Sequence, residues 1–248
     1  MSCNVTKCKI IHIGDKYPHF IYQMRNQELS NVKQEKDLGV IISNNFKMSD
    51  QCTAASKKPN KMLGFIIRNI GHKSPDMMKR LYTAFVRPHL EYAVHFWSPN
   101  YTIDQNSLKR VQRRAMKHIL ALRNVTYGER LQCLDMFSLN KRRLRGDLIE
   151  IFEILNQFDK IHPGKLFEMN KVPLTRGNVM KLKGQRYNTI VHKLYFSVRV
   201  GDHWNRLPAS VVFSNTIDGF KSRLDKHFRE VGFLLESVVR PSLKSYKF

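Results

Sequence analysis

Hydrophobic positions along the chain change their spacing near residue 49. Before it, short runs rich in Ile, Val, Phe and Tyr fall at residues 9–13, 20–24 and 38–43, and a turn-forming stretch at 14–18 separates the first two. Apolar runs bounded by turn residues are typical of β-strands. We expect the three strands to form a small antiparallel sheet, which is too small to be stable alone.

From residue 49 the apolar positions recur every three or four residues, which predicts helices. The first is expected at residues 49–69 and should be kinked or split at Pro59, because proline removes a backbone hydrogen bond. A second helix starts at Ser74, where a hydroxyl cap precedes a proline and an acid, and ends near residue 87. Its apolar side chains are Met77, Leu81 and Phe85, and an apolar segment at 90–97 follows.

The segment at residues 104–122 predicts an amphipathic helix with two contrasting faces. Its apolar positions are Leu108, Val111, Ala115, Ile119 and Leu122, which share one face at helical spacing. Its basic residues fall on the opposite face and are Lys109, Arg110, Arg113, Arg114 and Lys117. Because no acid occurs between Gln105 and Gly128, these cations have no local partner, which indicates a cationic stripe for binding an anion. An incidental basic surface remains the alternative.

A short helix near residues 129–134 leads to a long one at 139–157, with Leu144, Leu148, Ile151, Phe152 and Leu155 as its apolar stripe. The first half carries Lys141, Arg142, Arg143 and Arg145. Basic residues at a helix start oppose the helix dipole, so they are expected to serve something other than helix stability.

The chain beyond residue 162 is predicted to be less regular. Residues 163–189 contain several glycines and prolines and indicate a basic loop region with one or two weak strands. No acid occurs from residue 169 to 201, whereas seven basic residues do: Lys171, Arg176, Lys181, Lys183, Arg186, Lys193 and Arg199. Two helices are expected at 195–206 and 217–231, and a disordered tail at 240–248.

Charge narrows the choice of partner. The 248 residues include 43 Lys and Arg against 20 Asp and Glu, a formal net charge of +23, and 42% are hydrophobic. The apolar content is sufficient for a core, and the charge favours a polyanionic partner. Nucleic acid is the leading candidate and an anionic membrane surface the second.

No apolar run reaches the roughly 18 residues of a membrane span, and the start of the chain does not read as a signal peptide. A nuclear or cytoplasmic protein is therefore expected. The four cysteines are few and scattered and are interpreted as ordinary thiols: Cys3, Cys8, Cys52 and Cys133. Trp97 and Trp204 are expected in the core, although an indole ring can also stack on nucleic-acid bases. Asp202–His203 is more typical of helix structure than of a catalytic triad.

Several sequence blocks follow one another in order along nearly the whole chain. They include LYTAFVRPHLEYA at 81–93, LKRVQRRA at 108–115 and WNRLP at 204–208. The remaining blocks lie at 37–40, 97–99, 127–131, 141–147, 196–200 and 220–225. Together these blocks resemble the reverse transcriptase of jockey-like and chicken-repeat-like LINE retrotransposons. The ordered set is specific, whereas one block alone is weak.

The resemblance implies a mainly α protein with a small N-terminal β part. It divides the chain into late-palm strands (1–48), a helical thumb-like domain (49–160), a basic irregular linker (161–194), C-terminal helices (195–235) and a tail (236–248). Residues 38–40 are similar to the region that supports the primer end. Lys7 resembles a late-palm lysine that assists pyrophosphate departure, or is an exposed lysine before a strand.

The resemblance also implies which partners and cofactors to expect. Nucleotidyl transfer requires carboxylates that hold two metal ions about 4 Å apart, and the chain contains no Asp-Asp pair. We therefore expect no polymerase activity and no cofactor in this fragment, although the full-length family enzyme uses Mg²⁺. The expected partners are RNA, RNA–DNA hybrid or DNA, without sequence preference, together with the missing polymerase parts in a longer protein. The alternatives are a truncated or decayed element product without function and a co-opted helical scaffold for protein interaction.

Overall fold

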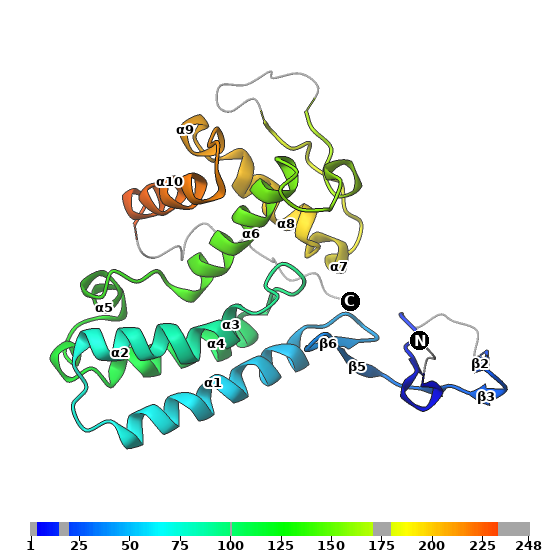
Figure 1. Ribbon diagram of the computed structural model, residues 1–248, viewed down its shortest axis with the longest axis horizontal. Helices are drawn as coiled ribbons and strands as arrows, with labels where there is room; N and C mark the ends of the chain where they lie inside the picture. The colour runs from blue at the N-terminus through cyan, green and yellow to red at the C-terminus, as the bar shows by residue number, and fades with distance from the viewer. Residues whose placement is uncertain (1–3, 15–19, 100, 171–179, 233–248) are drawn as a thin grey trace.

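The computed structural model describes residues 4–14, 20–99, 101–170 and 180–232. Within these ranges the protein is mainly helical and carries small two-stranded sheets near its N-terminus (Figure 1). This agrees with the predicted fold class. None of the described helices combines the length and apolar character needed to cross a bilayer.

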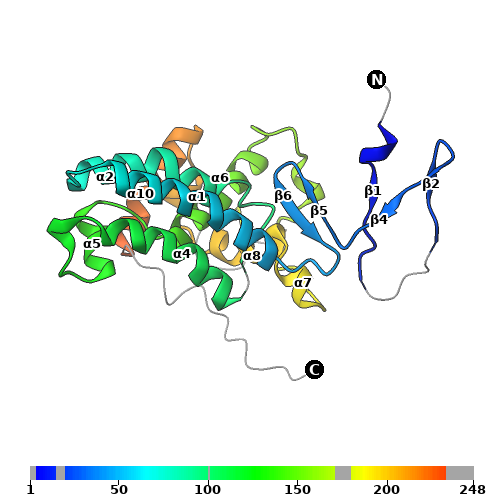
Figure 2. The same ribbon diagram turned by 90° about the horizontal axis from the view of Figure 1, so that it is seen from below.

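The strands pair two by two. β1 (Lys9–Ile10) pairs in parallel with β4 (Ser30–Asn31), whereas β2 (Gln23–Met24) and β3 (Gln27–Glu28) form an antiparallel hairpin, as do β5 (Gln34–Asp37) and β6 (Val40–Ser43). A 3-10 turn, Val5–Lys7, precedes β1. Figures 1 and 2 both show the first two pairs projecting away from the helices.

The predicted three-stranded antiparallel sheet is therefore wrong. Of the described strands, β6 packs on the first core through Val40, whereas Phe20 and Ile21, before β2, are 64% and 69% exposed. Both hairpins turn through paired residues with positive φ, Arg25–Asn26 and Leu38–Gly39, as two-residue hairpin loops require. β5 was missed because its residues, Gln-Glu-Lys-Asp, show no apolar alternation.

The helices occupy most of the remaining described chain. Those before residue 160 are α1 (Ser49–Asn69), α2 (Pro75–Leu81), α3 (Arg87–Glu91), α4 (Thr102–Lys117), α5 (Tyr127–Cys133) and α6 (Leu139–Leu155). Those after it are α7 (Ile190–Lys193), α8 (Phe196–Asn205), α9 (Ala209–Val212) and α10 (Ile217–Glu230). Two 3-10 turns, Leu120–Leu122 and Pro163–Lys165, lie between them. α7 and α9 were not predicted, because single helical turns show no periodicity.

Two proline-containing segments stay helical where the sequence predicted a break. α1 runs through Pro59 without splitting. α2 continues through a π-helical turn, Tyr82–Val86, into α3, so the predicted stop near Arg87 is wrong. The Arg87 N–H bonds to the Tyr82 carbonyl, and this longer spacing accommodates Pro88, which has no N–H of its own.

The buried face of this second helical region also differs from the predicted stripe. Met77 and Phe85 are 43% and 51% exposed, whereas Met78, Tyr82 and Val86 are buried. Both series have the same spacing, so periodicity alone does not select between them.

Two hydrophobic cores form the interior. The first gathers residues from β6 and α1 to the start of α6 and includes Trp97, and the second gathers α6, α8, α9 and α10 around Trp204. Both indoles are buried, as predicted. Figure 1 shows α6 between the two groups of helices. The expected tail at 240–248 lies outside the described residues.

Candidate nucleic-acid interface

α4 has one buried and one exposed face. Leu108, Val111 and Ala115 are each 1% exposed or less, and Ile119, just past the helix end, is fully buried. Near the helix start, the hydroxyl of Ser49 on α1 donates to the Asp104 carboxylate at 2.8 Å. The predicted apolar face is confirmed, although the helix ends at Lys117 rather than at residue 122.

The opposite face presents cations. Arg110, Arg113, Arg114 and Lys117 are exposed and Lys109 is half-buried. Within the described part of the chain, no carboxylate lies within ion-pairing distance of Arg110, Arg114 or Lys117. The Arg113 guanidinium lies 5.1 Å from the centre of the Tyr127 ring, a cation–π distance.

A buried amide holds this helix in place. The Gln112 Oε1 accepts hydrogen bonds from the Tyr127 hydroxyl and from the Leu139 N–H, both at 2.8 Å. The Gln112 Nε2 donates to the Phe137 carbonyl at 3.0 Å. Because α5 and the start of α6 are fixed to α4 through one side chain, the orientation of the cationic face is set by the core.

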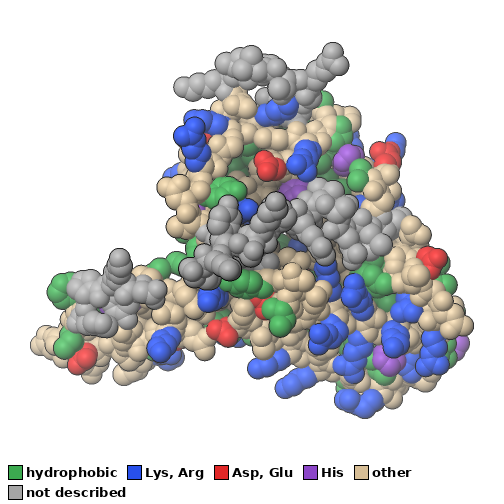
Figure 3. Space-filling view, turned by 180° about the vertical axis from the view of Figure 1, so that it is seen from behind, with side chains coloured by type: hydrophobic (Ala, Val, Ile, Leu, Met, Phe, Trp, Pro, Cys, Tyr) green, Lys and Arg blue, Asp and Glu red, His purple; other side chains and the backbone are tan. Residues whose placement is uncertain are grey.

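The basic surface extends beyond α4. Figure 3 views the molecule from behind. Lys and Arg side chains gather there over the part of the molecule that contains the first hydrophobic core. At the end of α4, burial lowers the pKa of His118, and the charges of Arg114, Lys73, Arg123 and Lys117 lower it further. Lys73, His118 and Arg123 were not predicted as part of the basic surface. Lys73 is 45 positions before His118, and no local sequence pattern links residues so far apart.

Two of the four basic residues on α6 form ion pairs inside the protein. The Arg142 guanidinium donates to both carboxylate oxygens of Glu91, at 3.0 and 2.9 Å. The Arg145 guanidinium donates in the same way to Asp225 of α10, at 2.5 and 2.9 Å. Such two-point pairs with carboxylates have the geometry expected of strong charge-assisted hydrogen bonds.

The other two are buried among backbone carbonyls and aromatic rings. Arg143 donates to the Leu90 and Trp97 carbonyls, at 2.8 and 2.7 Å, and its guanidinium lies 4.0 Å from the centre of the Trp97 ring. Lys141 is fully buried, and its ammonium donates to the carbonyls of Phe228 and Gly232 at the end of α10. Burial lowers the pKa of Lys141 to about 8.

The predicted phosphate contacts therefore fall into two groups. The α4 residues face solvent, whereas Lys141, Arg142, Arg143 and Arg145 are engaged within the fold and are not placed to meet a phosphate. At the start of α6 these side chains bond to other parts of the fold, which accounts for their unfavourable position relative to the helix dipole.

The remaining candidates are scattered. Lys7 is exposed in the turn before β1, close to no described carboxylate. In the basic loop region, Lys171 and Arg176 lie outside the described residues, and Lys183 pairs with Glu168 at 2.7 Å. Arg199, on α8, pairs with Asp147 of α6 at 2.8 Å.

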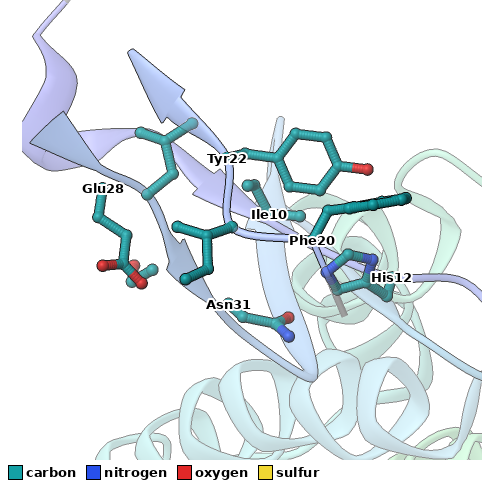
Figure 4. Close-up of a pocket in the computed structure, with 9 residues that line it drawn as sticks. Ile10, His12, Phe20, Tyr22, Glu28 and Asn31 are labelled. Carbon is teal, nitrogen blue, oxygen red and sulfur yellow. The ribbon is translucent and has the colours of Figure 1, made fainter. Parts of the chain in front are cut away.

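No group of three or more His, Cys, Asp or Glu side chains in the described ranges is placed to hold a metal ion. An open depression near the N-terminus is lined by Ile10, His12, Phe20, Tyr22, Glu28 and Asn31 (Figure 4). Glu28 is the one carboxylate among those lining residues, so this depression does not hold a pair of carboxylates. Cys52 and Cys133 are free thiols, as predicted, and Cys3 lies outside the described residues.

Comparison of the chain with protein-family models, with curated proteins and with solved structures finds no match in any of the three.

Proposed function

We propose that this chain is the thumb-containing part of a LINE-type reverse transcriptase and binds nucleic acid through phosphate contacts. The proposal combines the ordered sequence blocks with one structural observation. α4 presents Arg110, Arg113, Arg114 and Lys117 to solvent above a buried apolar face, and Arg110, Arg114 and Lys117 have no carboxylate partner among the described residues.

The spacing of the four residues supports contact with a backbone. They occupy positions i, i+3, i+4 and i+7, so they line one side of the helix over about 10 Å. Side chains that meet phosphates contribute affinity without reading bases. The ligand class is therefore RNA, DNA or their hybrid, with weak sequence preference, and the net charge of +23 favours such a polyanion over an anionic membrane surface of lower charge density.

The test removes the four charges and preserves the fold. Arg110, Arg113, Arg114 and Lys117 are changed together to Gln, which retains most of the helix propensity. Binding of a short labelled RNA–DNA duplex is then measured at several salt concentrations. Affinity is expected to fall similarly for unrelated sequences, and the slope of log K against log salt should shrink by about 3.

A matched control separates a local contact from net charge. Lys160, Arg186, Arg206 and Lys226 are exposed cations elsewhere on the molecule, and changing them to Gln removes the same charge. Their loss should leave the slope nearly unchanged. Equal loss in both variants would overturn the α4 interface, because net charge alone would then account for binding. No binding of the parent at low salt would overturn the whole proposal and favour a chain without nucleic-acid function.

A second control concerns the buried face. Val111→Asp places a carboxylate where the parent side chain is 1% exposed, so it should unfold the domain because the charge has no partner. Circular dichroism should show loss of helix for this variant and unchanged helix for the four-Gln variant.

A further inference from the structure

Two exposed tyrosines flank the short helix α7. Tyr187 precedes the helix and Tyr195 follows it, and they are 45% and 51% exposed. The Lys193 ammonium lies 5.5 Å from the centre of the Tyr187 ring. The centre of the His192 ring lies 5.2 Å from that of the Tyr195 ring, in an edge-to-face arrangement. Because consecutive side chains of α7 contact the two rings, both rings lie at this helix.

The backbone that presents the rings is fixed by hydrogen bonds from side chains. Gln185, shortly before the first ring, donates to the Leu166 carbonyl at 3.0 Å and accepts from the Ser197 hydroxyl of α8 at 3.2 Å. The Thr189 hydroxyl oxygen accepts from the His192 N–H at 3.1 Å and so caps the start of α7. Rings that are held in place before a ligand arrives lose less conformational freedom when they bind it.

The second core explains the neighbours of the two rings but not the rings themselves. Leu182, before Tyr187, is buried in that core, and Phe196, directly after Tyr195, packs against it. The two tyrosines instead face solvent, and neither hydroxyl bonds to a residue in the described part of the chain. Their aromatic faces are therefore free to contact a ligand.

Charge around α7 indicates which ligand fits. The sequence contains no acid from residue 169 to 201. Among the described residues, no carboxylate lies within ion-pairing distance of Lys193. Exposed rings beside a cation suit a ligand that combines flat π-faces with negative charge, as a single-stranded nucleic acid does. A double helix stacks its bases on one another and so offers no free face to these rings.

We propose that Tyr187 and Tyr195 stack on unpaired bases of a single-stranded RNA or DNA, and that Lys193 meets a neighbouring phosphate. This contact goes beyond the proposed function, because it concerns unpaired bases rather than a duplex and lies on a different element from α4. Since every base has a π-face, the contact should show little sequence preference.

The first experiment removes the rings from the full chain. Tyr187 and Tyr195 are changed together to Leu, and affinity for a short labelled single-stranded RNA should fall about 30-fold, because each stacked base contributes a factor of about five or more. Affinity for an RNA–DNA duplex of the same length should stay nearly unchanged. Changing both tyrosines to Phe keeps the rings, so this variant should bind the single strand as the parent does.

A matched control removes two exposed rings elsewhere. Phe65 and Phe85 are 58% and 51% exposed, and changing both to Leu should leave single-strand binding unchanged. Because stacking on a base releases no counterions, the tyrosine-to-Leu variant should keep the parent's slope of log K against log salt. Equal losses in the tyrosine and phenylalanine variants, or equal losses for the single strand and the duplex, would overturn the stacking contact.

The second experiment uses the unaltered chain and so does not depend on how a variant folds. A single-stranded RNA that carries iodouracil is irradiated in complex with the protein, which crosslinks the modified base to aromatic rings that stack on it. Mass spectrometry of the crosslinked peptides should identify Tyr187 or Tyr195. Crosslinks confined to other parts of the chain, or no crosslinks, would overturn the proposal.

The stacking contact and the α4 interface can fail separately. Loss of single-strand affinity in the tyrosine-to-Leu variant, with an unchanged four-Gln variant of α4, would support the stacking contact and overturn the α4 interface. The reverse result would overturn the stacking contact and leave the α4 interface standing. If the parent chain binds neither the single strand nor the duplex at low salt, both proposals are wrong.

Discussion

Lys141 and Arg143 show how a buried cation is stabilised when no carboxylate of the described residues bonds to it. Arg143 donates two hydrogen bonds to carbonyls and lies over an indole, and burial lowers its pKa to about 10. Lys141 bonds to two carbonyls and lies 5.2 and 4.8 Å from the centres of the Phe137 and Phe228 rings. Carbonyl oxygens and ring faces attract positive charge, but they offset only part of the cost of removing it from water.

Lys141 should therefore make stability depend on pH. Its pKa falls from 10.5 in the unfolded chain to about 8 in the folded protein. Between these values the unfolded chain binds more protons, so the free energy of unfolding should rise with pH from about 8 to about 10.5. Lys141→Met should flatten this rise, as measured by urea unfolding at several pH values.

Other groups titrate in the same range, so the comparison must be differential. Burial raises the pKa of Tyr82 well above its usual value and that of Cys52 to about 12, and both lower stability at high pH in every variant. Lys160→Met, which replaces an exposed lysine, should follow the parent. If the parent and Lys141→Met differ by a constant amount across the range, the ammonium is not the titrating group.

The sequence predicted the position of each basic cluster but not its use. On α4, Arg110, Arg114 and Lys117 have no carboxylate within ion-pairing distance in the described part of the chain. On α6 the partners are distant in sequence: Glu91 is 51 residues from Arg142, and Asp225 is 80 residues from Arg145. Local pattern cannot reveal such pairs, because they depend on which helices pack together.

Among the elements, several helices were predicted most closely. Ser74 caps α2 as expected, accepting a hydrogen bond from the Met77 N–H at 3.4 Å. α1 matches its predicted bounds, and α10 ends one residue before its predicted end. The strands were the least predictable, since each pair is two to four residues long and its register depends on turns rather than on a buried face.

Pro59 gives a prediction about an element. It lies inside α1, where proline supplies no N–H to the helix and its ring crowds the preceding turn. Pro59→Ala should raise the free energy of unfolding by about 1–3 kcal/mol, less than the full propensity difference because the buried ring is lost. Thermal unfolding measures the change.

The neighbouring position supplies the control. Lys58 is exposed on the same helix, and Lys58→Ala should change stability by less than about 0.5 kcal/mol. A loss of stability in Pro59→Ala would mean that packing around the ring outweighs the missing hydrogen bond.

At the scale of the molecule, α6 belongs to both cores. Leu139 packs in the first core, whereas Leu148, Ile151 and Phe152 pack in the second. The predicted domain boundary at residue 160 follows the end of this helix, but the hydrophobic contacts divide within it. Ion pairs reinforce the junction, because Arg142 bonds to Glu91 of α3 and Arg145 to Asp225 of α10.

Arg199 on α8 adds a connection across the junction. Its guanidinium donates to the Asp147 carboxylate of α6 at 2.8 Å and to the Val94 carbonyl at 3.0 Å. The Asp147 side chain is 8% exposed and that of Arg199 13%. Without Arg199, the buried Asp147 carboxylate keeps the His95 imidazole, whose Nδ1 lies 3.3 Å away, but loses its guanidinium partner, which is destabilising.

These connections predict that the two cores unfold together, and each core contains one tryptophan to report it. The Trp97 Nε1 donates to the Tyr92 carbonyl in the first core, and the Trp204 Nε1 donates to the Met180 carbonyl in the second. Trp97→Phe and Trp204→Phe leave one fluorophore each. In each variant, the fluorescence midpoint in urea should coincide with the midpoint from circular dichroism, as expected of a single cooperative unit.

The ion pair across the junction can be tested in the same two variants. Arg199→Gln should lower the midpoints of both fluorophores, because the free energy of unfolding falls by about 3 kcal/mol. Arg206→Gln, which replaces an exposed arginine near Arg199 in sequence, should leave the midpoints unchanged. Separate midpoints for the two fluorophores, each at odds with circular dichroism, would show instead that α6 joins two independently stable parts.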